Sequence, residues 1–82
     1  MANNIWTTLE ILNAAQDFDR VEGQVRSVIE EAQGWHPRAW ISIDALSTSG
    51  DNVSLEIMTA WDRGDRLVST LSTTLEKYVI KG

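Results

Sequence analysis

Hydrophobic residues follow two different spacings along this chain. In residues 5–13, 38–47 and 53–61 they occupy every second position, which is typical of β-strands with one buried face. In residues 18–33 and 65–77 they recur every three or four positions, which is typical of helices with one buried stripe. The pattern therefore predicts the order strand, helix, strand, strand, helix.

The segments between these elements carry residues that end helices and form turns. Gly34, followed closely by the chain's single proline, predicts the end of the first helix. Asp17 and Asp19 are candidate caps at its start. Residues 47–52, Ser-Thr-Ser-Gly-Asp-Asn, have the composition of a turn, so the second and third strands are expected to form a hairpin. The tail from Tyr78 is either the last helical turn or a very short fourth strand.

This order of elements predicts an α+β fold in one domain over residues 1–82. Two crossover helices on one face of an antiparallel sheet give a ferredoxin-like two-layer sandwich, βαββα with or without the short final strand. The inward positions of the strands and helices then form the core. The expected core residues are Leu9, Ile11, Val21, Val25, Ile29, Ile41, Ile43, Val53, Leu55, Ile57, Leu67, Leu71 and Leu75.

In such a sandwich the second face of the sheet has no helix over it. Trp6, Leu12, Trp40 and Met58 are expected there, among polar side chains. Tryptophan is enriched among residues that anchor protein interfaces, and a chain this small gains stability from additional burial. We therefore predict that these residues form an interface, in a homodimer or with a partner subunit. The alternative is that they are scattered exposed apolar residues without a role.

Composition and charge narrow the class of protein. The chain has 82 residues, 43% hydrophobic and 23% charged, as in ordinary soluble domains. It has no cysteine, which excludes disulfides and favours a reducing compartment. A net charge of −5 is unfavourable for nucleic-acid binding, which depends on neutralising phosphates. No apolar run reaches the roughly 20 residues of a membrane span, and the first four residues lack the basic start of a signal peptide. We expect a cytoplasmic protein with neither a membrane nor a nucleic-acid partner.

Residues that carry chemistry are few. His36 is the single histidine, and no nucleophile or orienting partner lies near it in sequence, so a loop role is expected. The loop from Trp35 to Trp40 either stacks a ligand or, as we favour, folds its aromatic rings over the end of the core. No phosphate loop, dinucleotide fingerprint or zinc-protease motif occurs. We predict no catalytic residue, metal site or cofactor, and a site built from carboxylates distant in sequence stays open as an alternative.

Several short stretches are similar to one known family. Residues 9–13, Leu-Glu-Ile-Leu-Asn, are similar to its first strand, and residues 20–23, Arg-Val-Glu-Gly, to its first helix. Residues 34–36 and 52–57 are similar to its glycine–aromatic corner and third strand, and residues 71–81 to its last helix and strand. On these stretches the chain resembles an ACT domain, most closely the short regulatory subunits of acetolactate synthase.

The resemblance implies a regulatory or assembly domain without catalytic activity, acting by association with another protein such as a metabolic enzyme. It also implies an alternative, an amino-acid sensor that uses the first strand–helix corner. The ligand residues of that corner are then Asn13, Gln16 and Asp17. The family usually has proline–glycine after the asparagine, whereas Ala15 and Gln16 follow here. Association is therefore the leading hypothesis.

A second resemblance involves the last helix. Leu67, Leu71 and Leu75, which follow Ala-Trp-Asp at residues 60–62, are similar to the last helix of another small protein. That protein is the dimerising subunit of the archaeal and eukaryotic tRNA threonylcarbamoyladenosine complex. This resemblance implies the same layered fold and a role as an accessory subunit.

Overall fold

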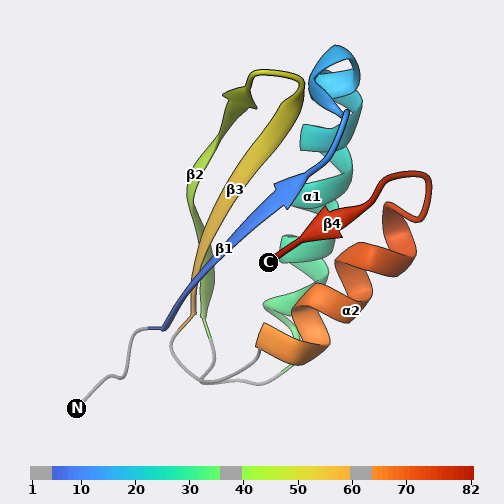
Figure 1. The fold of residues 1–82 in the computed structure, drawn as a ribbon. Coiled ribbons are helices and arrows are strands. Elements are labelled where there is room, and N and C mark those ends of the chain that lie inside the picture. Colours follow the sequence, from blue (N-terminus) through green and yellow to red (C-terminus); the bar gives the residue numbers. More distant parts are fainter. Residues whose placement is uncertain (1–4, 36–39, 60–63) are drawn as a thin grey trace.

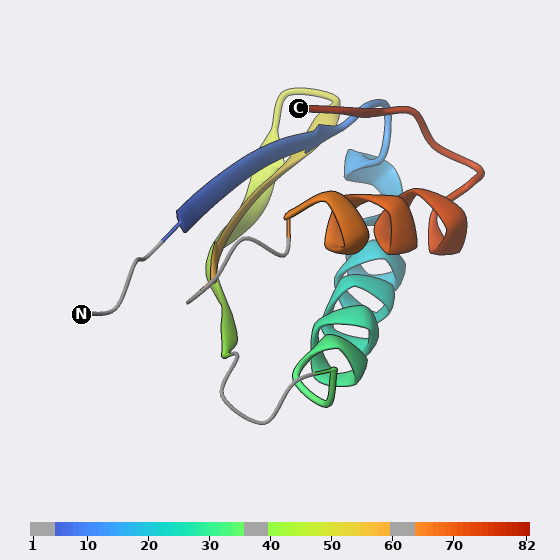
Figure 2. The same cartoon turned by 90° about the horizontal axis from the view of Figure 1, so that it is seen from below.

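The computed structural model describes residues 5–35, 40–59 and 64–82 and has two layers, a sheet and a pair of helices (Figure 1). The elements are β1 (Ile5–Ile11), the short 3₁₀ helix η1 (Ala15–Asp17), α1 (Phe18–Ala32), β2 (Ile41–Ser49), β3 (Asn52–Thr59), α2 (Gly64–Thr74) and β4 (Ile80–Lys81). The strands form one antiparallel sheet in the order β2-β3-β1-β4. Both helices cover the same face of this sheet (Figure 2). The predicted α+β class, with two helices and an antiparallel sheet, is confirmed.

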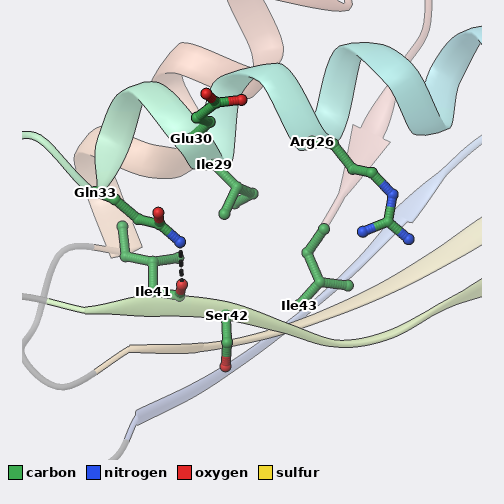
Figure 3. Close-up of a pocket in the computed structure, with 7 residues that line it drawn as sticks. All are labelled: Arg26, Ile29, Glu30, Gln33, Ile41, Ser42 and Ile43. Atoms are coloured by element: carbon green, nitrogen blue, oxygen red, sulfur yellow. Dashed lines mark hydrogen bonds between the residues drawn. The ribbon is translucent and has the colours of Figure 1, made fainter.

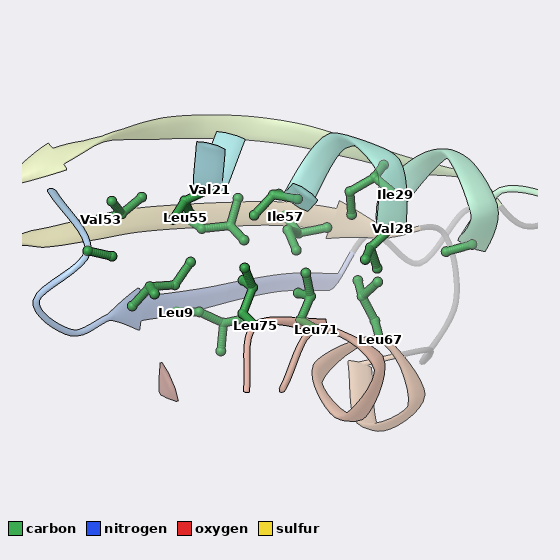
Figure 4. Close-up of a cluster of buried hydrophobic side chains, with 14 of the residues drawn as sticks. Leu9, Val21, Val28, Ile29, Val53, Leu55, Ile57, Leu67, Leu71 and Leu75 are labelled. Carbon is green, nitrogen blue, oxygen red and sulfur yellow. The ribbon is translucent and has the colours of Figure 1, made fainter. Parts of the chain in front are cut away.

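The core lies between the helices and the sheet. Leu67 and Leu71 of α2, and Leu75 directly after it, point into this space and are almost fully buried (Figure 4). All the predicted core residues are buried except Ile43, which is half-buried. Ala14, Val28 and Ala32 join them. The hydrophobic spacing of the sequence therefore identifies the inward faces of both layers.

A β-bulge in β2 changes the alternation that the sequence predicts. Ile43 pairs with Ile57, but Ala45, not Asp44, pairs with the next residue of β3, Glu56. The extra residue Asp44 shifts every later side chain of β2 to the opposite face. Strict alternation from Ile41 and Ile43 would place Ala45 inward, but it lies on the face without helices. Leu46 lies inward instead, half-buried against the core.

The turn of the β2–β3 hairpin contains two residues, Gly50 and Asp51, between the paired Ser49 and Asn52. Gly50 has a φ of +60° and Asp51 does not have a positive φ, which is the pattern of a type II′ turn. Glycine is favoured at this first turn position because L-residues rarely adopt a positive φ.

The start of α1 differs from the expectation. Asp17 occupies the N-cap position, but its side chain makes no capping hydrogen bond. Its carboxylate instead accepts a hydrogen bond from the hydroxyl of Tyr78, near the other end of the chain. The side chain thus links α1 to the segment before β4, and its predicted capping role is wrong. His36, expected in a loop, lies outside the described residues.

Candidate functional site

The candidate site is the sheet face that neither helix covers, which we call the open face. The pairing of the strands assigns its residues to rows that run across the sheet. One row holds Ser42, Met58 and Trp6, the next Ala45, Glu56 and Thr8, and the third Ser47, Ser54, Glu10 and Lys81. These rows bring together side chains from all the strands.

One end of the open face is apolar and exposed. Trp6 lies directly across from Met58, and Trp6 is 55% exposed to solvent. Trp40, immediately before β2 and 39% exposed, follows the same alternation as Ser42 at this end. The sheet therefore brings together the predicted interface residues Trp6 and Met58, with Trp40 at the same end.

Leu12, the remaining predicted interface residue, lies at the opposite end of the open face. It lies six positions after Trp6 in the sequence, which corresponds to roughly 20 Å along a strand. Its N–H donates to the carbonyl oxygen of Val79 at 2.8 Å, and Val79 is itself 66% exposed. The open face thus has two apolar ends, and Val79, which the sequence analysis missed, belongs to the second. The sequence signal that could have identified Val79 is strand alternation: if Ile80 faces the core, Val79 next to it faces outward.

The middle of the open face carries two carboxyl groups that share a hydrogen bond. The bulge residue Asp44 and Glu56 are joined through their side chains. This hydrogen bond, followed by desolvation and the charge of Asp44, raises the pKa of Glu56 above its ordinary 4.5. Thr8 Oγ1 donates to Glu56 Oε2 at 3.4 Å, and this hydrogen bond lowers the pKa of Glu56. The middle of the face is therefore acidic and holds a proton more readily than an isolated carboxylate.

The strand–helix corner holds the residues that the resemblance assigns to a ligand: Asn13, Gln16 and Asp17. Asn13 has a φ of +55°, and its N–H donates to Asn52 Oδ1 at 3.0 Å. The side chain of Asp17 is engaged by Tyr78, and this hydrogen bond is the main reason why the pKa of Tyr78 lies above its ordinary 10. Gln16 is exposed. The corner brings the three residues close in the fold, with Asn13 and Asp17 held by contacts within the protein.

Trp35 contributes to packing between the helices. It is half-buried against the core, and the guanidinium carbon of Arg66 in α2 lies 3.9 Å from the centre of its ring. Such a cation–π contact is worth about 0.5–1 kcal/mol when exposed. The prediction that the aromatic rings of residues 35–40 fold over the end of the core agrees with the position of Trp35 but not with that of Trp40, which is exposed.

The two edges of the sheet differ in how their backbone groups are used. The hydrogen bond from Leu12 to Val79 shows that the even-numbered residues of β1 direct their N–H and C=O groups toward β4. β4 pairs with β1 only at Glu10 and the residue after it. Among the described residues, no strand continues beside Trp6 and Thr8. Their backbone groups therefore point away from β3, to the side of β1 on which β4 lies.

The edge at β2 is protected. The C=O of Ile41 points outward by the same alternation, and Gln33 Nε2 of α1 donates to it at 2.9 Å. The bulge at Asp44 then interrupts the regular ladder further along the strand. Bulges and charged residues are known devices against pairing at sheet edges. Strand addition is thus disfavoured at the edge of β2.

Two hollows accompany these edges. A groove of about 400 Å³ lies between α1 and β2 and is lined by Arg26, Ile29, Glu30, Gln33, Ile41, Ser42 and Ile43. Figure 3 shows the hydrogen bond from the side chain of Gln33 to the backbone oxygen of Ile41 across this groove. The side chain of Ser42 points away from the helix. The second hollow, of about 340 Å³, lies where β4 ends beside β1 and is lined by Thr8, Leu9, Glu10, Lys81 and Gly82.

In residues 5–35, 40–59 and 64–82 no group of three or more His, Cys, Asp or Glu side chains is arranged to hold a metal ion. Over the same ranges, no helix has the length and apolar character needed to cross a membrane.

Comparison with known proteins gives no relative from which to assign a family or a function. No protein-family model, no curated protein and no solved structure matches this chain.

Proposed function

We propose that this chain is a non-catalytic association domain of ACT type that contacts another protein chain through its open face. The observation that carries the proposal is the exposed Trp6 beside Met58 on a sheet face without a helix. A large aromatic side chain exposed beside another apolar one is a common anchor of protein interfaces.

The architecture supports the assignment to the ferredoxin-like group. One helix connects β1 to β2 and another connects β3 to β4, and the strand order is β2-β3-β1-β4. Two interleaved βαβ halves produce this arrangement. The ACT resemblance, which spans most of the chain, adds a regulatory or assembly role.

Site-specific photo-crosslinking in the native host tests this function. A photoreactive amino acid placed at Met58 should crosslink to a discrete protein or to a second copy, because this position faces the partner. The same amino acid at Ser72, on the exposed side of α2, is the matched control and should not crosslink. Absence of a crosslink from position 58, with the protein folded by circular dichroism, would contradict the proposal.

Amino-acid sensing is the second candidate, and it rests on the left-handed Asn13 at the strand–helix corner. A thermal-shift screen with branched-chain amino acids separates it from association, because a ligand of the native state raises the melting temperature.

A further inference from the structure

We propose that the open face binds an α-helix of a partner protein that carries a large apolar residue and, one turn away, an arginine. The apolar residue packs against Trp6 and Met58, and the guanidinium group lies at the carboxyl groups of Asp44 and Glu56. This inference rests on the proposed association role and names the chemistry of the partner.

The apolar and the acidic parts of the open face lie in neighbouring rows of the sheet. Trp6 and Met58 form one row, and Thr8 and Glu56 form the next, two residues along the same strands. Two residues of a strand span roughly 7 Å. One turn of an α-helix, from residue i to residue i+4, spans roughly 6 Å. A helix that lies along β1 and β3 can therefore place one side chain on each row.

The apolar row provides the first contact. Trp6 is 55% exposed, and the half-buried Met58 lies directly across from it. The flexible thioether of methionine adapts to the shape of an incoming side chain, and tryptophan offers a large apolar surface. A leucine or phenylalanine of a partner therefore fits this row, but apolar contact alone is not directional and does not orient the helix.

The carboxyl pair in the next row provides the orientation. A hydrogen bond joins the side chains of Asp44 and Glu56, and this bond, desolvation and the charge of Asp44 raise the pKa of Glu56. The pair therefore holds a proton between its two acidic groups. A guanidinium group can take the place of that proton, because its planar set of N–H groups donates to carboxylates and its charge offsets theirs.

The strands around the pair supply no cation of their own. β1, β2 and β3 contain no lysine or arginine, and Lys81 of β4 lies opposite Glu10, one row further along. The open face is therefore complementary to a basic surface. The net charge of the whole chain, −5, favours the approach of the same class of partner.

A helix fits this face because it forms its backbone hydrogen bonds within itself and can be buried against a sheet without unpaired groups. The two helices of the chain pack on the opposite face in this way (Figure 2). The open face of a second copy fits less well. It can contact the apolar row, but it brings the same two carboxyl groups and no lysine or arginine from β1, β2 or β3.

The test is a titration of the isotopically labelled full chain, at a concentration where light scattering shows a monomer. The probe is an end-blocked, alanine-rich helical peptide with leucine and arginine at positions i and i+4. It should shift the amide NMR signals of Thr8, Glu56 and Met58 and the indole N–H signal of Trp6. A peptide with citrulline in place of arginine keeps the shape without the charge and should bind at least about tenfold more weakly. A peptide with the arginine moved to i+2 tests the spacing and should be weakened similarly.

Variants of the chain separate the carboxyl pair from general charge attraction. Glu56→Gln should weaken binding of the arginine peptide at least about tenfold. Glu31→Gln removes the same charge from the exposed side of α1 and should leave binding unchanged. Binding to the natural chain should strengthen as pH rises from 4.5 through the raised pKa of Glu56, because the cation binds the deprotonated pair, and Glu56→Gln should lose this dependence. The retained amide spectrum shows whether each variant is folded, and the citrulline and i+2 peptides give the same test without altering the chain.

The inference is overturned if the arginine peptide fails to bind at millimolar concentration or if the citrulline peptide binds equally well. It is also overturned if the shifts lie on the helices, or if Glu56→Gln and Glu31→Gln weaken binding to the same extent. Failure of the association role has a different sign, the absence of a crosslink from position 58. A chain that crosslinks from position 58 but does not bind the arginine peptide contradicts only this inference.

Discussion

Asn52 joins three parts of the chain through one side-chain amide. Its Oδ1 accepts from the N–H of Asn13, and its Nδ2 donates to Glu10 Oε2 at 3.1 Å. Beside it, Asp51 accepts a backbone hydrogen bond from Ala15 at 3.0 Å. The hairpin turn thus holds the strand–helix corner, which explains how Asn13 keeps a left-handed conformation that costs energy for most residues.

Gly23 is the residue at which stability can be increased most directly. It lies exposed within α1, and a Cβ built on it meets no atom within 4 Å. Gly23→Ala should therefore raise the free energy of unfolding by about 1 kcal/mol, because alanine loses less backbone entropy in a helix. Urea denaturation measures this.

Gly50 provides the contrast for that measurement. At its φ of +60° the substitution Gly50→Ala should lower stability by about 1–2 kcal/mol, because alanine is strained there. If Gly23→Ala destabilises the chain as Gly50→Ala does, our account of Gly23 is wrong.

Glu56 should make stability depend on pH. Its pKa is raised in the folded protein, so the protonated form favours folding, and its stabilising contribution is lost as pH rises from 4.5 through the raised pKa. Glu56→Gln keeps a hydrogen-bond donor for Asp44 without the second charge. The variant should melt at a higher temperature at pH 7 than the natural chain and should depend less on pH between about 4.5 and 7.

Thr8→Val changes the same titration in the opposite direction. The hydroxyl of Thr8 lowers the pKa of Glu56 by donating to its charged form, so its removal should steepen the loss of stability as pH rises. Melting temperatures of the Glu56→Gln and Thr8→Val variants, measured across this pH range, test both expectations. Identical profiles for the two variants would exclude the Asp44–Glu56 hydrogen bond as the cause.

At the scale of elements, hydrophobic spacing predicts β1, β2, β3 and both α-helices, because burial decides where they form. It leaves the tail open between a last helical turn and a short strand, and the structure has the strand, β4. The ends of helices and the pairing register of strands depend on single residues, and the sequence predicts them less well. The composition of β2 gives no sign of the bulge at Asp44. The bulge nevertheless places Ala45 and Leu46 each on the other side of the sheet from the side that regular alternation predicts. The sequence makes Asp17 a candidate helix cap, but its carboxylate accepts a hydrogen bond from Tyr78, 61 residues away. Contacts over such separations have no local signal.

Proline substitutions test the direction of the backbone groups of β1. The N–H of Thr7 faces β3 within a regular ladder, whereas that of Thr8 points to the other side of β1, away from β3. Thr7→Pro should therefore cost roughly 2 kcal/mol more than Thr8→Pro, because only the former loses a ladder hydrogen bond. Chemical denaturation of both variants measures the difference. Equal losses would show that both amides are in the same environment.

At the scale of the whole molecule, the open face combines two apolar ends with an acidic middle. The apolar ends favour contact with another chain, whereas the acidic middle opposes close packing against an identical face. The sequence predicts the apolar residues individually. It does not show that Trp6 and Met58 are adjacent or that Leu12 lies with Val79, since both facts follow from strand pairing.

We expect the chain to self-associate through the apolar end at Trp6, Trp40 and Met58. Burial of several hundred Å² of apolar surface contributes roughly 25 cal/mol per Å², and the cost of association offsets much of this. A micromolar equilibrium is therefore expected, visible by light scattering at about 100 micromolar. Trp40→Glu should favour the monomer with its circular dichroism spectrum retained, because the ring is 39% exposed and outside the core. Ser72→Asp, on the exposed side of α2, should have no effect. A monomeric natural chain at that concentration would exclude self-association, and unfolding of the Trp40→Glu variant would place this ring in the core.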